Sequence, residues 1–334
     1  MVQDLVLGLT FSMIEFQLSY LDDKIIINNA LETTSVSRAS SDLWIQARNS
    51  NPIKNKNYNT QRKIVELVYD AYKKLPDANG RIMPNEAQNR LYHEKVVEFR
   101  IGAPITWLMK LAPEGHFIYD WRYSKLYQDC EIDESLVKNL STLYSKGACT
   151  KYHHVTSDIV YPFDYILFAH QSMTNVHYYH NRITGLQLMY EIKDWANENK
   201  KHVVFRMHPT SGEDYSNLSH LISEFTHVDT TSSITRLVSE ANQVWTVSSA
   251  VGFEGMLMNK PVTIFGESDY HPVVNRANSV EEAYRRHDQD KYLRFITWYA
   301  KKLCINIHST AASDRVYRRL YDYFVEDRRI DVLY

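Results

Sequence analysis

The sequence predicts an α/β protein whose C-terminal half holds a doubly wound parallel sheet. From about residue 160, short apolar runs of strand length alternate with amphipathic segments of helix length. The expected strands cover 164–171, 202–209, 243–247 and 262–265. Polar residues follow the runs, as they do where parallel strands end beside a ligand. The chain has 334 residues, 44% of them hydrophobic and 23% charged, which suffices for two domains.

The helices between these strands are predicted from apolar spacing. Over 185–199, Leu188, Ile192 and Trp195 fall on one side. The segments 218–225 and 234–241 repeat apolar residues at i, i+3, i+4 and i+7, and a helix is expected to begin at Ser249. Right-handed crossovers would place these helices on both faces of the sheet.

The N-terminal half has a less regular pattern. Helices are expected over 61–75 and 91–101, turns over 76–90 and a strand within 115–127. Residues 1–150 contain no glycine-rich dinucleotide fingerprint, so an ordinary nucleotide-binding loop is not expected there.

We expect three parts in the chain: an N-terminal domain over 1–160, a parallel-sheet domain over 161–275, and C-terminal helices over 276–334. Aromatic and aliphatic residues recur at helical spacing in the last part. A solvated helix face is expected to carry Arg315, Arg318 and Arg319.

Composition limits the class of protein. The chain has 38 Lys and Arg against 40 Asp and Glu, a net charge of −2, which argues against nucleic acid as a partner. We expect Cys130, Cys149 and Cys304 to be reduced, cytosolic thiols. No window resembles a targeting signal or a spanning helix, so we expect a cytoplasmic protein and leave peripheral membrane contact open. The His-x-x-His at 177–180 lacks a third ligand, so no metal is expected.

The best candidate for chemistry is Ser248-Ser249, where an apolar strand meets a helix. A helix N-terminus has free N–H groups and a partial positive charge, which suit a phosphate. Gly252, one turn later, would let the backbone or a ligand come close. The alternative is simple N-capping of the helix by serine.

Four further residues lie near the ends of these elements. His208 and Arg206 close the second strand and could donate to a phosphate, although His208 could equally be a turn residue. Gln171 closes the first strand, where a loop role is the alternative. Glu254 could bond a ribose or be a surface carboxylate.

The order of these residues resembles the capsule polysaccharide biosynthesis glycosyltransferases, which include the bacterial Kdo transferases. The resemblance rests on His208-Pro209 after a strand, then Ser249-x-x-Gly252-x-Glu254, then Lys260-Pro-Val. Bacterial sialyltransferases have a similar His-Pro motif and a Ser-Ser motif. The match covers about 160–270, and Gln171 is followed by Ser where many relatives have Pro.

The resemblance implies a B-type glycosyltransferase fold with two Rossmann-like domains, the N-terminal one atypical, and C-terminal helices. In that fold 1–160 would be the acceptor-side domain, 161–275 would bind the nucleotide-sugar, and the helices of 276–334 would pack back on the N-terminal domain. It implies that His208, Ser248 and Ser249 contact the donor phosphate and that Glu254 contacts the ribose. Because the His-Pro and Ser-Ser motifs occur together, it suggests a CMP-linked donor, with no further cofactor. Asp120, in Tyr-Asp-Trp-Arg, is the candidate catalytic base.

The resulting hypothesis is transfer of Kdo or a related acidic sugar from a CMP donor to a glycan or glycolipid acceptor. One alternative is an enzyme that uses a UDP-sugar, including a viral type that modifies DNA. Another is an inactive transferase fold that acts as a binding or assembly subunit.

Overall fold

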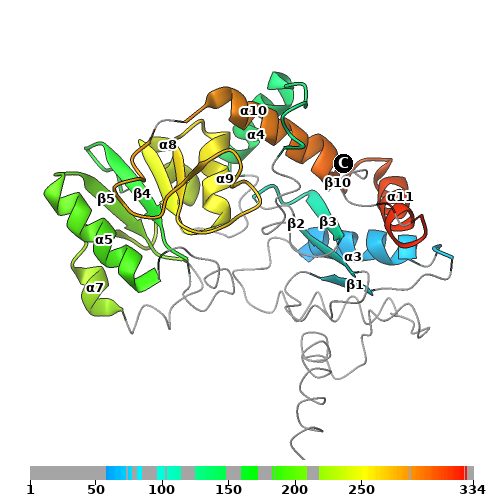
Figure 1. Ribbon diagram of the computed structural model, residues 1–334, viewed down its shortest axis with the longest axis horizontal. Coiled ribbons are helices and arrows are strands. Elements are labelled where there is room, and N and C mark those ends of the chain that lie inside the picture. The colour runs from blue at the N-terminus through cyan, green and yellow to red at the C-terminus, as the bar shows by residue number, and fades with distance from the viewer. Residues whose placement is uncertain are drawn as a thin grey trace, which may run out of the picture. The chain divides into compact units, whose positions relative to one another are not determined.

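The computed structural model divides the chain into two compact units, and each is described by itself (Figure 1). Unit 1 is Met1–His116 with Tyr299–Tyr334, and unit 2 is Phe117–Trp298. The residues described are 58–72, 74–76, 81–84, 96–101, 104–113, 125–147, 159–171, 183, 185–208, 218–285, 287–326 and 328.

Unit 2 contains a six-stranded sheet in which every neighbouring pair is parallel. Its order is β6-β5-β4-β7-β8-β9. The strands are β4 (Tyr165–Ala169), β5 (His202–Arg206), β6 (His227–Asp229), β7 (Gln243–Thr246), β8 (Val262–Ile264) and β9 (Asn275–Arg276). The prediction of an α/β fold with a parallel sheet is therefore confirmed. The predicted strands match β4, β5, β7 and β8, while β6 and β9, of three and two residues, were not predicted.

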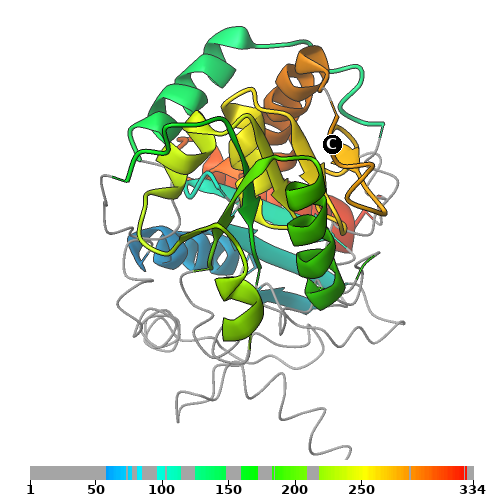
Figure 2. The same ribbon diagram turned by 90° about the vertical axis from the view of Figure 1, so that its left-hand side faces the viewer.

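Helices pack on both faces of this sheet (Figures 1 and 2). The helices of unit 2 are α4 (Glu134–Ser145), α5 (Gly185–Glu198), α7 (Ser219–Ser223), α8 (Ile234–Glu240), α9 (Ala250–Leu257) and α10 (Gln289–Trp298). On one face lie α5 and α7, whose apolar residues share a core cluster with Phe168 and Phe205. On the other, α9 comes so close to β7 and β8 that Gly255 lies against Val244 and Val262. Helices α4 and α10 pack on α9.

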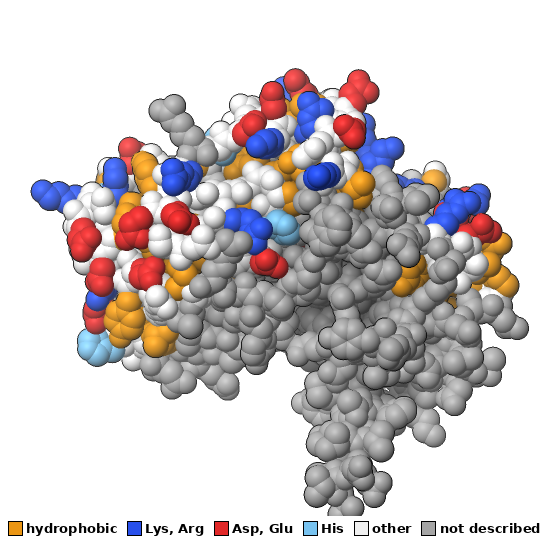
Figure 3. All heavy atoms as spheres, in the orientation of Figure 1, with side chains coloured by type: hydrophobic (Ala, Val, Ile, Leu, Met, Phe, Trp, Pro, Cys, Tyr) orange, Lys and Arg blue, Asp and Glu red, His pale blue; other side chains and the backbone are white. Residues whose placement is uncertain are grey.

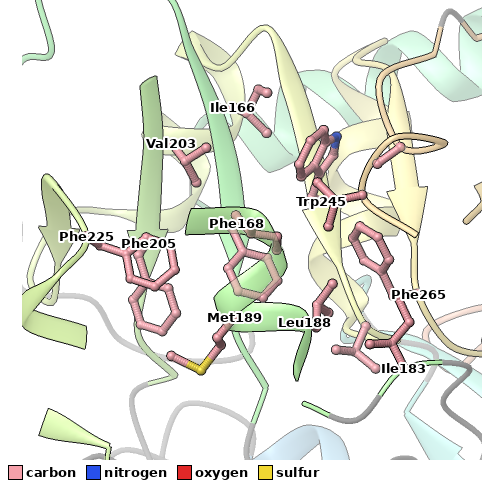
Figure 4. Packing of buried hydrophobic residues seen from close by; sticks show 14 of the residues in the cluster. Ile166, Phe168, Ile183, Leu188, Met189, Val203, Phe205, Phe225, Trp245 and Phe265 are labelled. Atoms are coloured by element: carbon pink, nitrogen blue, oxygen red, sulfur yellow. The ribbon is translucent and has the colours of Figure 1, made fainter. Parts of the chain in front are cut away.

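The core between the sheet and α5 is built from alternate strand residues (Figure 4). Ile166 and Phe168 point to this face, together with Trp245 and with Leu188 of α5, and each is at most 2% exposed. Side chains alternate along a strand, so the intervening residues face the opposite side, where α9 packs. The continuous apolar runs in the sequence are explained by this burial on both faces.

The strand order reverses at one place in the sheet. From β4 the chain continues outward through β5 and β6, and it then returns to β7, on the other side of β4, and continues through β8 and β9. In doubly wound sheets, ligands bind beyond the carboxyl ends of the strands at this reversal. The position of interest therefore lies after β4 and β7.

Unit 1 contains a four-stranded mixed sheet of order β1-β2-β3-β10. Strands β1 and β2 are parallel, and the other pairs are antiparallel. Helices α3 and α11 pack together and share a core with the sheet. The elements are α3 (Tyr58–Tyr72), β1 (Arg81–Pro84), β2 (Val96–Ile101), β3 (Leu108–Pro113), η5 (Tyr299–Leu303, a π-helix), β10 (Cys304–Asn306) and α11 (Ala312–Phe324).

Three expectations need correction here. The segment 91–101 was predicted as a helix, but its described part is β2, with Val97 and Phe99 buried at the period of two typical of a strand. The segment 275–334 is not wholly helical, because β9 and β10 lie within it. Arg315, Arg318 and Arg319 do not form a solvated face, because of these three only Arg318 is exposed.

The division into units also differs from the domain boundaries expected from sequence. Residues 117–160 and 276–298 fall in unit 2, where α4 packs on α8, α9 and α10. Of the C-terminal part, which was expected to pack on the first domain, 299–334 fall in unit 1, where β10 pairs with β3. The reason is long-range pairing, which apolar periodicity within a segment does not report. No described helix has the length and apolar character needed to cross a bilayer.

Candidate functional site

The site at the strand reversal begins with a tie between the ends of β4 and β7. Gln171 follows β4 and is 6% exposed. Its side-chain oxygen accepts hydrogen bonds from the Ser248 backbone N–H at 3.2 Å and from the Ser248 hydroxyl at 3.1 Å. Two residues earlier on each strand, the Thr246 hydroxyl donates a hydrogen bond to the Ala169 carbonyl at 2.8 Å. Two residues predicted separately from sequence, Gln171 and Ser248, are thus brought together.

The N-terminus of α9 starts directly after this tie. Ser249 is the N-cap residue, and its hydroxyl oxygen accepts from the Val251 N–H at 3.3 Å. The Ser249 hydroxyl proton and the backbone N–H groups of Ser249 and Ala250 find no acceptor among the described residues. These three donors lie at the positive end of a helix dipole, which suits an anion such as a phosphate.

The two serines therefore differ in what they offer. The Ser248 hydroxyl proton is directed to Gln171, whereas the Ser249 hydroxyl accepts from the helix and keeps its proton for another partner. The structure thus confirms that the Ser249 oxygen caps the helix, while its hydroxyl proton has no acceptor among the described residues.

His208 and Arg206 follow from β5, the strand next to β4. His208 is half-buried. Arg206 is 5% exposed. Its Nη1 donates a hydrogen bond to the backbone carbonyl oxygen of Asp229 at 3.2 Å and forms an ion pair with the Asp229 carboxylate Oδ1 at 3.8 Å. The same carboxylate accepts the backbone N–H groups of Thr231 and Ser232 at 3.1 and 2.8 Å. These contacts of Arg206 secure the end of β6, so a role at a phosphate stays a prediction.

Glu254 lies inside the protein, in the second turn of α9. It is 5% exposed, and its Oε2 accepts a hydrogen bond of 2.6 Å from the Tyr144 hydroxyl of α4. Burial raises the pKa of Glu254 to about 7, and the bond from Tyr144 opposes part of that rise. The carboxyl group is therefore directed to α4, and contact with a ribose stays a prediction.

Gly252 has a neighbour that sequence reasoning missed. A Cβ at this position would lie 2.7 Å from Cε2 and Cζ of Tyr270, so the close approach at Gly252 is made by a tyrosine side chain. Tyr270 also donates its hydroxyl to the Ser249 carbonyl. It comes from the polar segment Gly266–Tyr270 after β8, where no sequence signal marks it.

Two other predictions have a more limited outcome. Asp120, the predicted base, lies outside the described residues. Among the residues that are described, no group of three His, Cys, Asp or Glu side chains is arranged to hold a metal ion. On the face of the molecule seen in Figure 3, the described Lys and Arg side chains lie interspersed with Asp and Glu.

The described residues of unit 2 form a parallel α/β sheet with unengaged N–H groups at the strand reversal, and part of the chain matches a known family model. Residues 156–312 match the model of the family described as capsule polysaccharide biosynthesis protein. Over these residues, the resemblance predicted from sequence is thereby confirmed. A sequence search among curated proteins finds no match.

Several solved structures show looser similarity. The Thermosulfurimonas dismutans KpsC β-Kdo 2,7 transferase is 16% identical, with a TM-score of 0.42 over 64% of this chain and 75% of the other. The β-Kdo 2,4 transferase of the same protein is 15% identical, with a TM-score of 0.43 over 61% and 72%. A Methanocaldococcus jannaschii UDP-GlcNAc 2-epimerase is 13% identical, with a TM-score of 0.31 over 80% and 81%. Similarity at this level does not assign a substrate or an activity to this chain.

Proposed function

We propose that this protein is a glycosyltransferase and that it binds the phosphate of a nucleotide-sugar donor at the N-terminus of α9. The observation that carries the proposal is the arrangement at the strand reversal. Gln171 holds Ser248, and the donors of Ser249 and Ala250 have no acceptor among the described residues. The family match over 156–312 supports transfer of a sugar as the reaction.

In this proposal the chemistry is mainly electrostatic. Glycosyl transfer develops negative charge on the leaving phosphate, and preorganised donors lower the energy of that state. The backbone N–H groups at the start of α9, the Ser249 hydroxyl and the His208 imidazole would supply those donors. A base must also remove the acceptor hydroxyl proton, and Asp120 remains the candidate from sequence.

The finer assignment is a CMP-linked donor of Kdo or a related acidic sugar, with a glycan or glycolipid as acceptor. It is supported by the combination of His208-Pro209 with Ser248-Ser249. A UDP-linked donor would use the same phosphate donors, so only nucleotide selectivity separates the two. We propose no resident cofactor or metal for this reaction.

A second candidate is a non-catalytic protein that keeps the transferase fold for binding or assembly. The observation that favours it is the engagement of two predicted ligand residues inside the protein. Arg206 contacts Asp229, and Glu254 contacts Tyr144, both in buried positions. In such a protein the start of α9 would not bind nucleotide.

Calorimetric titration with CMP, UDP, GDP and ADP separates these candidates. We expect the wild type to bind CMP selectively and His208→Ala to lose most of that affinity. His220→Ala is the matched control, because the His220 side chain is 92% exposed on α7. Selective UDP binding would overturn the donor and keep the enzyme class. Absence of binding by all four nucleotides would overturn the transferase and favour the non-catalytic candidate.

A further inference from the structure

Tyr270 forms a hydrogen bond with the first peptide group of α9, on its carbonyl side. The residue is 1% exposed, and its hydroxyl donates to the carbonyl oxygen of Ser249, the N-cap of the helix. That carbonyl also accepts the Gly252 N–H at 3.0 Å. Two donors therefore fix one carbonyl group at the start of the helix.

Fixing this carbonyl fixes a donor on the other side of the same peptide. The Ser249 carbonyl and the Ala250 N–H belong to one planar, trans peptide unit, so they point in opposite directions. A hydrogen bond that sets the direction of the carbonyl therefore sets the direction of the Ala250 N–H. This N–H is one of the donors without an acceptor among the described residues.

The position of the tyrosine ring depends on Gly252. A Cβ on that residue would overlap the Tyr270 hydroxyl oxygen and would lie 2.7 Å from two ring carbons. The ring also meets Phe253 edge to face, with centroids 6.3 Å apart. Burial raises the pKa of Tyr270 above its ordinary value, so the hydroxyl keeps its proton and remains a donor at neutral pH.

We propose that Tyr270 is a positioning residue of the anion site, and that it aims the Ala250 N–H at the phosphate of the bound nucleotide. This inference rests on the proposed function, and it goes beyond it by adding a residue that does not contact the ligand. A merely structural tyrosine would support the fold but would leave the preference for the phosphate group unchanged.

The test compares Tyr270→Phe with the wild type, using CMP and cytidine as probes. The phenylalanine ring retains the packing and removes the hydroxyl, and with it the bond to the Ser249 carbonyl. We expect CMP to bind about fivefold to tenfold more weakly, and cytidine, which lacks the phosphate, to bind as in the wild type. Tyr292→Phe is the matched control. Tyr292 is also 1% exposed, but its hydroxyl accepts from the Val262 N–H of β8 at 3.1 Å.

A second set of variants keeps the test decisive if Tyr270→Phe is poorly folded. Gly252→Ala should displace the tyrosine and weaken CMP binding as Tyr270→Phe does. When Tyr270→Ala has already removed the ring, adding Gly252→Ala should cost little further affinity, because the space is then open. If Gly252→Ala weakens CMP binding as much in the Tyr270→Ala background as in the wild type, the role of Tyr270 is overturned.

The outcomes separate the two proposals. If the wild type binds no nucleotide, the proposed function is overturned, and the role of Tyr270 at a nucleotide is overturned with it. If the wild type binds CMP and Tyr270→Phe binds it equally well, only the role of Tyr270 is overturned. A parallel loss of CMP and cytidine affinity would also overturn it, because the tyrosine would then support the fold without aiming a phosphate donor.

Discussion

The end of η5 in unit 1 and the start of α9 in unit 2 differ in whether the protein supplies partners for the backbone groups at a helix end. Both are helix ends, where backbone groups lack partners within the helix. At η5, Arg319 donates to the Lys302 and Leu303 carbonyls, the latter at 2.6 Å, and Arg315 donates to the Lys301 carbonyl at 3.0 Å. At α9, the N–H groups of Ser249 and Ala250 have no acceptor among the described residues.

This difference separates a structural helix end from a candidate binding site. A buried carbonyl without a partner costs free energy, so the protein supplies its own donors where no ligand is to enter. A helix N-terminus is the positive end of the helix dipole. Where its N–H groups have no partner in the protein, an anion can bind them and stabilise them. The comparison predicts that changes at the end of η5 mainly alter stability, whereas changes at the start of α9 mainly alter binding.

The largest expected effect is at the end of η5. Arg319→Ala removes the donors from two carbonyls and should lower the free energy of unfolding by about 4 kcal/mol. Arg318→Ala, one residue away on the exposed face of α11, should change it by less than about 0.5 kcal/mol. Urea unfolding of both variants measures this difference. If both variants lowered the free energy of unfolding equally, the bonds from Arg319 to the end of η5 would not be what stabilises this helix end.

The next effect concerns the buried part of α9. The Glu254 pKa rises from 4.5 to about 7 on folding, so folding stabilises the protonated form. That contribution is fully present below pH 4.5 and is lost as the pH rises through 7. Between pH 5 and pH 8 it should lower the free energy of unfolding by about 2–3 kcal/mol.

Glu254→Gln should remove this pH dependence, because the amide stays neutral and can still accept from Tyr144. The free energy of unfolding is measured by urea titration at both pH values for the wild type and the variant. An equal pH slope in the two proteins would show that Glu254 is already ionised at pH 5 in the folded state.

The sequence predicts the parallel sheet better than it predicts the rest of the fold. The strands β4, β5, β7 and β8 are buried on both faces, so their residues form apolar runs that are visible locally. Strand β2 was mistaken for a helix, and β10, from the C-terminal part, pairs with β3 about 200 residues earlier. Pairing over such distances leaves no periodic signal in either segment.

The candidate site shows the same limit. Gln171, Ser248 and Ser249 could be predicted because each follows a recognisable strand, and strand ends meet in a parallel sheet. The partners of Glu254 and Arg206 could not be predicted, because Tyr144 and Asp229 come from other elements. Tyr270 follows no recognisable motif, and only its packing against Gly252 reveals its position.

A smaller effect is expected at the start of α9. Ser249→Ala removes both a helix cap and a hydroxyl donor to the proposed phosphate, so CMP should bind at least about tenfold more weakly. Loss of the cap alone should cost about 1 kcal/mol of stability. Ser239→Ala on α8 is the matched control, because among the described residues the Ser239 hydroxyl bonds its own helix alone, at the Arg236 carbonyl. If Ser249→Ala binds CMP as tightly as the wild type does, the CMP phosphate does not bind at the Ser249 hydroxyl.

The smallest effect sharpens the comparison between the two adjacent serines. Ser248→Ala leaves the backbone bond to Gln171 intact and removes only a hydroxyl whose proton is directed to that side chain. CMP should therefore bind about twofold to threefold more weakly, well short of the loss in Ser249→Ala. Calorimetry on both variants measures the ratio. If Ser248→Ala loses more affinity than Ser249→Ala, the Ser248 hydroxyl proton must turn from Gln171 to the ligand on binding, while the backbone bond from Ser248 to Gln171 stays in place.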